Sequence, residues 1–319
     1  MTIHDVWYGD SMAARTVRIL LYPLSLLYAG GWQIYLLIYR LGIKTAQKPH
    51  KKILCIGNLV AGGTGKTPTV VFIANLLQEL GYTVVIGCSG YGSPRAEDAS
   101  AAPEGPLDPA EWGDEPAEIR ELLPDIPLIV GRARVIAAKI CAKRYPDAVL
   151  LMDDGFQHMP LAKDRSIILD PPTPNTLTFP AGPYRESRAS GRRRASLVVP
   201  SDEWRFEFSP IRFTTAAGTP IPAPPQARVL TAVGRPDKVQ RNLQSAGVEI
   251  VEFIALPDHD KLEFDLAQRQ QDVPWIVTRK DWVKLRSRCT NDSNVVLAER
   301  QAAIEPSEEL KKWLKIVLG

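Results

Sequence analysis

Residues 53–69 constrain the fold of this chain more than any other stretch. The stretch opens with an apolar run, residues 53–56, that predicts a buried parallel strand, and a helical pattern begins after the glycine-rich residues 61–67. Glycines let backbone N–H groups turn toward anionic oxygens, and the start of the following helix adds partial positive charge. Val60 stands where the strict phosphate-loop pattern has glycine, but the Gly-Lys-Thr core and the strand–loop–helix order remain. The stretch predicts a nucleoside triphosphate site.

The chemistry of such a site assigns roles to individual side chains. Lys66 is expected to reach the β- and γ-phosphates, and Thr67 to ligate Mg²⁺. Asp153 and Asp154 follow an apolar strand at the edge where parallel sheets bind ligands, and two adjacent carboxylates need a cation nearby. We therefore expect a second Mg²⁺ contact there, from either carboxylate. The nucleotide-binding residues expected from the loop are Gly62, Gly63, Thr64, Gly65, Lys66 and Thr67.

Composition excludes several classes of protein. The chain has 319 residues, enough for one large domain or two ordinary ones, and 45% of them are apolar, which is typical of a folded globular protein. The net charge of +3 gives no global indication of nucleic-acid binding. The four cysteines are far apart and include no CxxC pair, and no His/Cys spacing resembles a metal cage. No obligate protein partner is evident.

Strands alternate with helices along most of the chain, which predicts a parallel α/β sheet flanked by helices. A second, smaller α/β unit is expected after a proline-rich segment. The expected organisation is an N-terminal helical segment at 1–50, the phosphate-loop domain at 51–205, a linker at 206–227, the second unit at 228–305 and a C-terminal helix at 306–319. The strands predicted in the two units are residues 53–56, 83–87, 126–130, 147–154, 166–170, 229–233, 249–255 and 275–278.

Residues 19–39 contain no charged side chain and are flanked by arginine and lysine. Their length approaches that of a membrane span, which needs about 20 apolar residues. Proline, glycine and glutamine interrupt the run, however, and its tyrosines and tryptophan are of the kind that favours the headgroup level. A membrane-surface helix, a core helix and a true span all remain open; we favour the surface helix, on an anionic cytoplasmic leaflet.

A set of motifs in fixed order resembles the tetraacyldisaccharide 4′-kinase family, the lipid A 4′-kinases of Gram-negative bacteria. The motifs run from about residue 20 to residue 285, nearly the whole chain. They are Gly57-Asn58 before the loop 62–68, Gly90-Tyr91-Gly92, Gly113-Asp114-Glu115-Pro116, Val130-Gly131-Arg132, Asp153-Asp154-Gly155-Phe156-Gln157-His158, Pro180-Ala181-Gly182-Pro183-Tyr184-Arg185-Glu186, Pro257-Asp258-His259 and Thr278-Arg279-Lys280-Asp281. The resemblance implies ATP- and Mg²⁺-dependent phosphorylation of the 4′-hydroxyl of a tetraacyldisaccharide 1-phosphate. It also implies a peripheral or monotopic location on the cytoplasmic side of the inner membrane.

The resemblance also implies site residues. It pairs Asp114 with His259 as the base that accepts the hydroxyl proton, alongside the charge of Lys66. The basic cluster at 185–194 is either a solvated charge run or a contact for the substrate's 1-phosphate or for anionic headgroups, since guanidinium groups fit phosphate. Arg185 lies in the family's motif and is favoured for the substrate, whereas the other arginines are expected to serve the membrane surface. Together with Arg185, the expected substrate-binding residues are Tyr91, Gln157 and His158.

The chain departs from the family pattern at three positions: Ser89 replaces an arginine, Asp260 a second histidine and Ala133 an acidic residue. These changes leave the phosphate loop, the carboxylates and the Asp114–His259 pair in place but affect the expected contacts with substrate. The sequence leaves open a soluble-substrate P-loop kinase or partitioning-type ATPase, and a non-catalytic lipid-binding relative. It does not determine acyl-chain preference or oligomeric state.

Overall fold

The computed structural model describes residues 2–263, 266, 272–289 and 294–319 of the chain. A seven-stranded sheet forms the larger of two α/β units, and all its neighbouring strands are parallel except the edge strand β3. The strand β1 that leads into the phosphate loop lies between β5 and β6, inside the sheet, so its residues are buried on both faces. In sheet order the strands are β3 (Ala99–Ala101), β4 (Leu128–Gly131), β2 (Val84–Cys88), β5 (Val149–Asp153), β1 (Ile53–Asn58), β6 (Arg165–Leu169) and β7 (Leu197–Val199).

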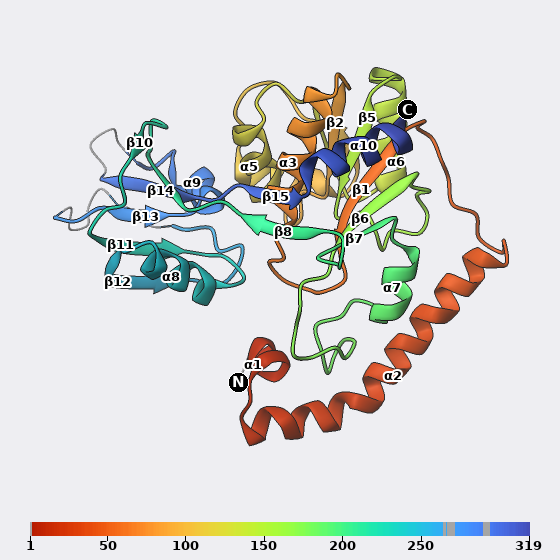
Figure 1. Cartoon of the computed structure of the whole chain (residues 1–319), viewed down its shortest axis with the longest axis horizontal. Coiled ribbons are helices and arrows are strands. Elements are labelled where there is room, and N and C mark those ends of the chain that lie inside the picture. The colour runs from red at the N-terminus through yellow and green to blue at the C-terminus, as the bar shows by residue number, and fades with distance from the viewer. Residues whose placement is uncertain (1, 264–265, 267–271, 290–293) are drawn as a thin grey trace.

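Helices cover both faces of this sheet, each closing its own apolar core (Figure 1). On one face lie α3 (Lys66–Glu79), α5 (Asp114–Leu122) and the C-terminal helix α10 (Ser307–Leu318). On the other face α6 (Arg134–Arg144) packs through Ala137, Ala138 and Cys141. The fold predicted from the sequence, a parallel sheet flanked by helices, is confirmed.

The second unit is a six-stranded mixed sheet in which the four strands of the α/β repeat are parallel. Two further strands extend it in antiparallel fashion. Its helices are α8 (Pro236–Ser245) and α9 (Arg279–Leu285). In sheet order the strands are β10 (Pro220–Ile221), β9 (Arg212–Thr215), β14 (Val295–Glu299), β13 (Trp275–Val277), β11 (Gln226–Thr231) and β12 (Glu249–Ala255).

A two-stranded antiparallel ribbon joins the units, formed by β8 (Arg205–Phe208) and β15 (Ala302–Glu305) (Figure 1). The chain passes out along β8 and returns along β15, so α10 packs in the core of the first unit. Residues 206–227, expected to be a proline-rich linker, carry most of β8 together with β9 and β10. The sequence patterns also missed β3, β7, β14 and β15, which have three to five residues each, so their periodicity is weak.

The N-terminal segment forms α1 (Ile3–Tyr8) and the long helix α2 (Met12–Arg40), which runs along the outside of the first unit (Figure 1). Helix α2 has 29 residues, and its most apolar window has a mean hydropathy of 1.2 with 11% of that window buried. It is therefore not a core helix. By length and composition it is able to cross a membrane, although one such helix is weak evidence that it does.

Polar contacts fasten α2 to the loop that follows β6. Ser25, buried in the middle of α2, donates to the Thr178 carbonyl (2.9 Å) and accepts from the Ala181 N–H (2.9 Å). One turn further on, the Tyr28 hydroxyl donates to the Arg185 carbonyl at 2.8 Å. The helix is thereby tied to the segment that carries Arg185.

Candidate active site

The phosphate loop, residues 59–65, joins β1 to α3. Gly65 ends the loop with a φ of 91°, a left-handed conformation that favours glycine, and a Cβ there would lie 2.9 Å from the Phe206 ring of the ribbon. Asn58 at the end of β1 donates a hydrogen bond to the Thr64 hydroxyl (2.8 Å), which holds the loop under the start of the helix. Helix α3 begins at Lys66, within the glycine-rich stretch 61–67 rather than after it, so Lys66 and Thr67 lie in its first turn.

Asp154 lies beside this loop and is held by two cations. It directly follows β5, has a φ of 52° and donates its N–H to the Ile56 carbonyl at 3.0 Å. The Arg185 guanidinium lies 2.9 and 3.2 Å from its two carboxylate oxygens, and the Lys66 ammonium 3.9 Å away. Burial alone would raise the pKa of Asp154, but these two cations outweigh it and lower the pKa. Asp154 therefore links the loop lysine to Arg185.

Asp153 has a different environment, although it is the adjacent residue. It pairs in register with Ile56 of β1, is 2% exposed, and its Oδ1 has no hydrogen-bond partner. Burial, together with the nearby charges of Glu115 and Asp154, raises the pKa of Asp153 to about 7. A buried carboxylate oxygen without a partner, close to a phosphate loop, fits the chemistry of a bound cation.

Asp114 and His259, which are far apart in the sequence, meet across the two units. Asp114 begins α5, and His259 lies in the loop after β12. The imidazole Nδ1 lies 2.9 Å from Asp114 Oδ2 and 3.2 Å from Oδ1. When Nδ1–H donates to the carboxylate, Nε2 carries the lone pair and is free to accept a proton. His259 has a φ of 64°, a strained conformation for a residue other than glycine.

Opposite charges shift the pKa of both partners. Burial alone would raise the pKa of Asp114, but the hydrogen bond from His259 and the charges of Lys280, His259 and Lys284 lower it to about 2. The hydrogen bond to Asp114 raises the pKa of His259, against the opposing effects of burial and of Lys280. The carboxylate is therefore ionised, and the imidazole is a stronger base than an ordinary histidine.

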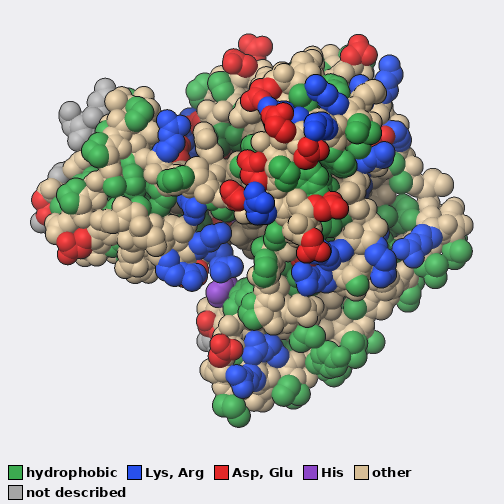
Figure 2. Space-filling view, viewed as in Figure 1, with side chains coloured by type: hydrophobic (Ala, Val, Ile, Leu, Met, Phe, Trp, Pro, Cys, Tyr) green, Lys and Arg blue, Asp and Glu red, His purple; other side chains and the backbone are tan. Residues whose placement is uncertain are grey.

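A cleft of about 500 Å³ brings these groups together. Its walls include the phosphate loop, Asp154 and Arg185 on one side and His259 on the other. Figure 2 shows Lys and Arg side chains gathered where the two units meet. The cations that line the cleft are Lys66, Arg185, Arg235, Lys238 and Lys280. This arrangement places phosphate-binding groups and a paired base around one space.

Comparison with known proteins identifies the family of this chain. The family model described as tetraacyldisaccharide-1-P 4′-kinase matches residues 17–318. The chain is 32% identical to the tetraacyldisaccharide 4′-kinase of Shewanella woodyi over 303 residues, covering 89% of this chain and 86% of that protein. It is 30% identical to that of Syntrophus aciditrophicus over 316 residues, covering 79% of this chain and 83% of that one. The chain belongs to the tetraacyldisaccharide-1-P 4′-kinase family.

Family membership makes the chain a kinase of lipid A biosynthesis that phosphorylates the 4′-hydroxyl of a tetraacyldisaccharide 1-phosphate. It sets aside the soluble-substrate kinase and the partitioning-type ATPase. A solved structure, described as the "apo" form of LpxK from Aquifex aeolicus in complex with ATP, matches with a TM-score of 0.80 at 24% identity. The match covers 95% of this chain and 100% of that one, and it shows the shared fold.

The four residues expected to bind the substrate of this kinase lie in two places. Tyr91 and Arg185 line the cleft, and the Tyr91 ring lies 5.7 Å from that of His259. Gln157 and His158 lie outside the cleft lining. Gln157 donates to the Asn58 carbonyl at 3.0 Å. Burial and nearby cations lower the pKa of His158 to about 4, so His158 is neutral near pH 7.

The basic cluster after Arg185, which was expected to serve the membrane surface, also makes ion pairs within the protein. It forms a helix, α7 (Arg188–Arg194), and buried carboxylates hold three of its four arginines. Arg188 and Arg192 pair with Asp170 at 2.9 and 2.6 Å. Arg194 pairs with Glu186 at 2.6 Å, and Glu186 also accepts from Trp32 of α2 at 3.1 Å. The sequence pattern did not indicate these acidic partners, which are distant along the chain. The contact with the membrane surface stays a prediction, because Arg188 and Arg192 are still 40% and 35% exposed.

Sequence reasoning gave no role to several other residues around the cleft. Arg134, buried at the start of α6, donates to the Asp154 carbonyl at 3.1 Å and supports the strained residue. Ser89, one of the departures from the family pattern, lines the cleft. Lys280 lies 3.6 Å from Asp114. Its motif, Thr278–Asp281, carried the only sequence signal for it.

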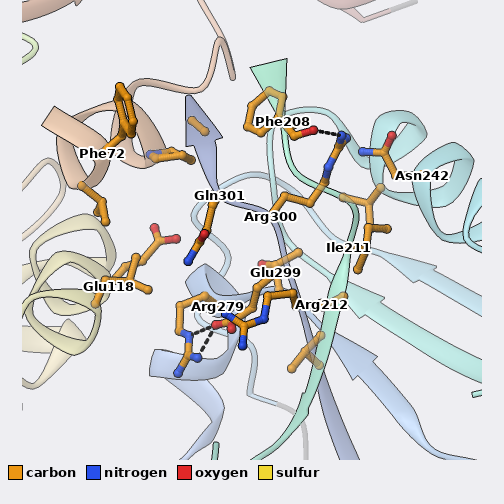
Figure 3. A pocket seen from close by; sticks show the side chains of 18 of the residues that line it. Phe72, Glu118, Phe208, Ile211, Arg212, Asn242, Arg279, Glu299, Arg300 and Gln301 are labelled. Atoms are coloured by element: carbon orange, nitrogen blue, oxygen red, sulfur yellow. Dashed lines mark hydrogen bonds and ion pairs between the residues drawn. The ribbon is translucent and has the colours of Figure 1, made fainter. Parts of the chain in front are cut away.

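A second cavity, of about 570 Å³, lies behind the cleft between α3, the ribbon and the sheet of the second unit. Its wall is mostly apolar, with Glu118 on the α5 side and the Arg279–Glu299 pair opposite (Figure 3). Glu118 lines both the cavity and the cleft, and burial raises its pKa to about 8. The cavity marks where the two units pack incompletely.

Proposed function

We propose that this kinase transfers the γ-phosphoryl group of ATP within the cleft, with the Asp114–His259 pair as the base. The phosphate loop and His259 line the same cleft, and Asp114 binds the imidazole from behind that lining; this meeting supports the proposal most directly. Phosphoryl transfer requires positioning, neutralisation of charge and a group that accepts the proton of the attacking hydroxyl. The cleft offers side chains for each of these requirements.

Lys66 and the loop N–H groups neutralise the phosphates. Lys66 reaches the cleft from the first turn of α3, so the helix N-terminus adds partial positive charge at the same point. The salt link from Asp154 directs Lys66 and Arg185 toward the same space. Arg185 is thus placed to bind either a transferred phosphoryl group or a phosphate of the substrate.

Thr67, Asp153 and Asp154 would hold Mg²⁺, which neutralises phosphate charge when bound. The unpartnered Oδ1 of Asp153 supports this assignment. Among the described residues, no group of three or more His, Cys, Asp or Glu side chains is arranged to hold a metal ion. Proteins commonly hold Mg²⁺ through one or two carboxylates together with phosphates and water.

His259 accepts the proton of the attacking hydroxyl at Nε2, while Asp114 fixes the ring and stabilises the charged form. The shift in the pKa of each partner favours this division of roles, because the carboxylate stays ionised while the imidazole changes charge.

Helix α2 would bring this site to the lipid, lying on the cytoplasmic face of the inner membrane. Large apolar side chains on α2 point away from the protein, among them Ile19 (72% exposed), Leu20 (71%) and Leu27 (72%). Figure 2 shows hydrophobic side chains along the lower edge of the molecule, where α2 runs in Figure 1. Because Tyr28 binds the backbone of Arg185, the membrane-facing helix and the cleft are mechanically joined.

A labelled-phosphate assay tests the reaction, and it also addresses the non-catalytic alternative. The purified chain is incubated with γ-labelled ATP, Mg²⁺ and the tetraacyldisaccharide 1-phosphate in detergent. Label is expected on the distal sugar, and His259→Ala is expected to reduce it about a hundredfold. Label in the absence of Mg²⁺, or full turnover by the folded variant, would contradict the proposed site.

Vesicle flotation tests the membrane contact. The double change Leu20→Glu/Leu27→Glu should reduce recovery with anionic vesicles, because it places two carboxylates on the exposed face of α2. Ile316→Glu is the matched control, because Ile316 is 82% exposed on α10, away from α2. Equal flotation of both variants would show that the chain binds the membrane through another surface.

A further inference from the structure

The Thr278–Asp281 motif begins α9, and its outer residues fix this helix to the second sheet. The Thr278 hydroxyl caps the helix, accepting from the Asp281 N–H at 3.2 Å. Asp281, fully buried, accepts from the Thr231 hydroxyl (2.9 Å) and the Ala232 N–H (3.0 Å) at the end of β11. The position and direction of the first turn of α9 are thereby determined.

The arginines of α9 and its C-cap fix the helix to the first unit. Arg279 donates to Glu121 of α5 at 3.3 Å and also pairs with Glu299 of β14 (Figure 3). Arg286 pairs with the same Glu121 and donates to the Leu107 carbonyl at 2.8 Å. Helices α5 and α9 are therefore locked together one or two turns beyond Asp114.

Between these two anchors, the side chain of Lys280 reaches the catalytic pair. Its ammonium lies 2.9 Å from Asp258 Oδ1 and 3.6 Å from Asp114 Oδ2, and the side chain is 16% exposed. Asp258 directly precedes His259 in the sequence. Lys280 thus contacts both the carboxylate that binds the imidazole and the backbone neighbour of the imidazole.

We propose that Lys280 is a positioning residue of the Asp114–His259 pair. By bridging Asp114 and Asp258, it sets the imidazole across the junction of the units, and its positive charge opposes the charge that the ring gains when it accepts a proton. The inference rests on the proposed role of His259 as the base.

The charges around His259 support this role. The imidazole faces Asp114 from α5, Asp258 from its own loop, the ammonium of Lys280 from α9 and the Tyr91 ring. Lys284, one turn further along α9, lies 3.9 Å from Asp114 and donates to the Asp260 carbonyl.

The carboxylates of Asp114 and Asp258 favour the protonated form of the imidazole, which cannot accept a further proton. The positive charge of Lys280 opposes them and lowers the pKa of His259. Replacing Lys280 by an uncharged residue removes that opposition, so the pKa of His259 rises.

The test is the titration of the His259 side chain in the full-length protein, followed by ¹H–¹⁵N NMR in detergent without substrates. The chain has four histidines, and the signal is assigned by its loss in His259→Ala. Lys280→Met should raise the titration midpoint by roughly one pH unit, because it removes a nearby positive charge that lowers the pKa of His259. Lys280→Arg should largely restore the midpoint. The acid limb of the kcat profile should move by the same amount as the midpoint.

Lys312→Met is the matched control, because it removes one positive charge on α10, where Lys312 pairs with Glu309. It should leave the midpoint unchanged. An unchanged midpoint in folded Lys280→Met, with His259→Ala still inactive, would overturn the role of Lys280 and leave the base in place. Full activity of His259→Ala would instead overturn the base itself, so the two failures are distinguishable.

Discussion

The two sides of the cleft are built in different ways. On the phosphate side, the loop and Lys66 come from one strand–loop–helix run, and the carboxylates end the neighbouring strand of the same sheet. On the base side, Asp114 comes from one unit and His259 from the other, and four cationic side chains of α9 and its C-cap contact α5 acids. The phosphate side depends on local structure within one core, whereas the base side depends on how the two units dock.

The largest effect is expected on the phosphate side. Lys66→Ala should lower turnover on the order of a thousandfold, because it removes a cation aimed at the transferred phosphate, while folding and flotation stay unchanged. Turnover of the folded variant with ATP, beside its circular dichroism, measures this. Near-normal turnover would remove the loop from the active site.

A smaller loss of turnover, about a hundredfold, is expected when either Asp114 or His259 is replaced. Asp114→Asn and His259→Ala should each slow the chemical step, and the double variant should lose little more than the worse single one, because the two act as a unit. Single-turnover rates for the three variants measure the coupling. If Asp114 merely stabilises the start of α5, Asp114→Asn should be almost silent, and additive losses would separate the two residues.

A change in how the two units dock should affect the base side of the cleft and leave the phosphate side intact. Glu121→Gln weakens the pairs with Arg279 and Arg286, so we expect kcat to fall several-fold while affinity for an ATP analogue is retained. Rapid-quench rates and analogue titration measure the two effects. Glu309→Gln, an exposed acid of α10, is the control. Loss of nucleotide affinity in Glu121→Gln would show that the two sides are not independent.

The smallest expected effect is on the pH dependence of kcat. Because the hydrogen bond to Asp114 raises the pKa of His259, and the base acts when neutral, kcat should rise with pH through an apparent pKa above the ordinary value of about 6.5. That value belongs to the coupled pair. A profile from pH 5.5 to 9 checks it, with Asp114→Asn expected to move the acid limb to lower pH. A limb that stays in place would remove Asp114 from the pair.

Local sequence patterns accounted for much of the fold. The apolar runs predicted all five central strands of the first sheet within a few residues, because strands buried on both faces are continuously apolar. The loop chemistry at 59–65 is likewise a matter of adjacent residues. The edge strands β3 and β7, the interior strand β14 and the ribbon strand β15 were missed, because three to five residues with little alternation carry no clear period.

The partners of charged side chains were decided by tertiary structure alone. Arg188, Arg192 and Arg194 read as a solvated basic run, yet they bind Asp170 and Glu186. The separation of Asp114 from His259 along the chain carries no distance information, so only the family resemblance suggested their pairing. No local pattern gave Lys280 a role, because its contact with Asp114 exists only where α9 packs against α5. Spacing along a strand or helix determines local conformation, whereas an ion pair across two units depends on how both cores fold and dock.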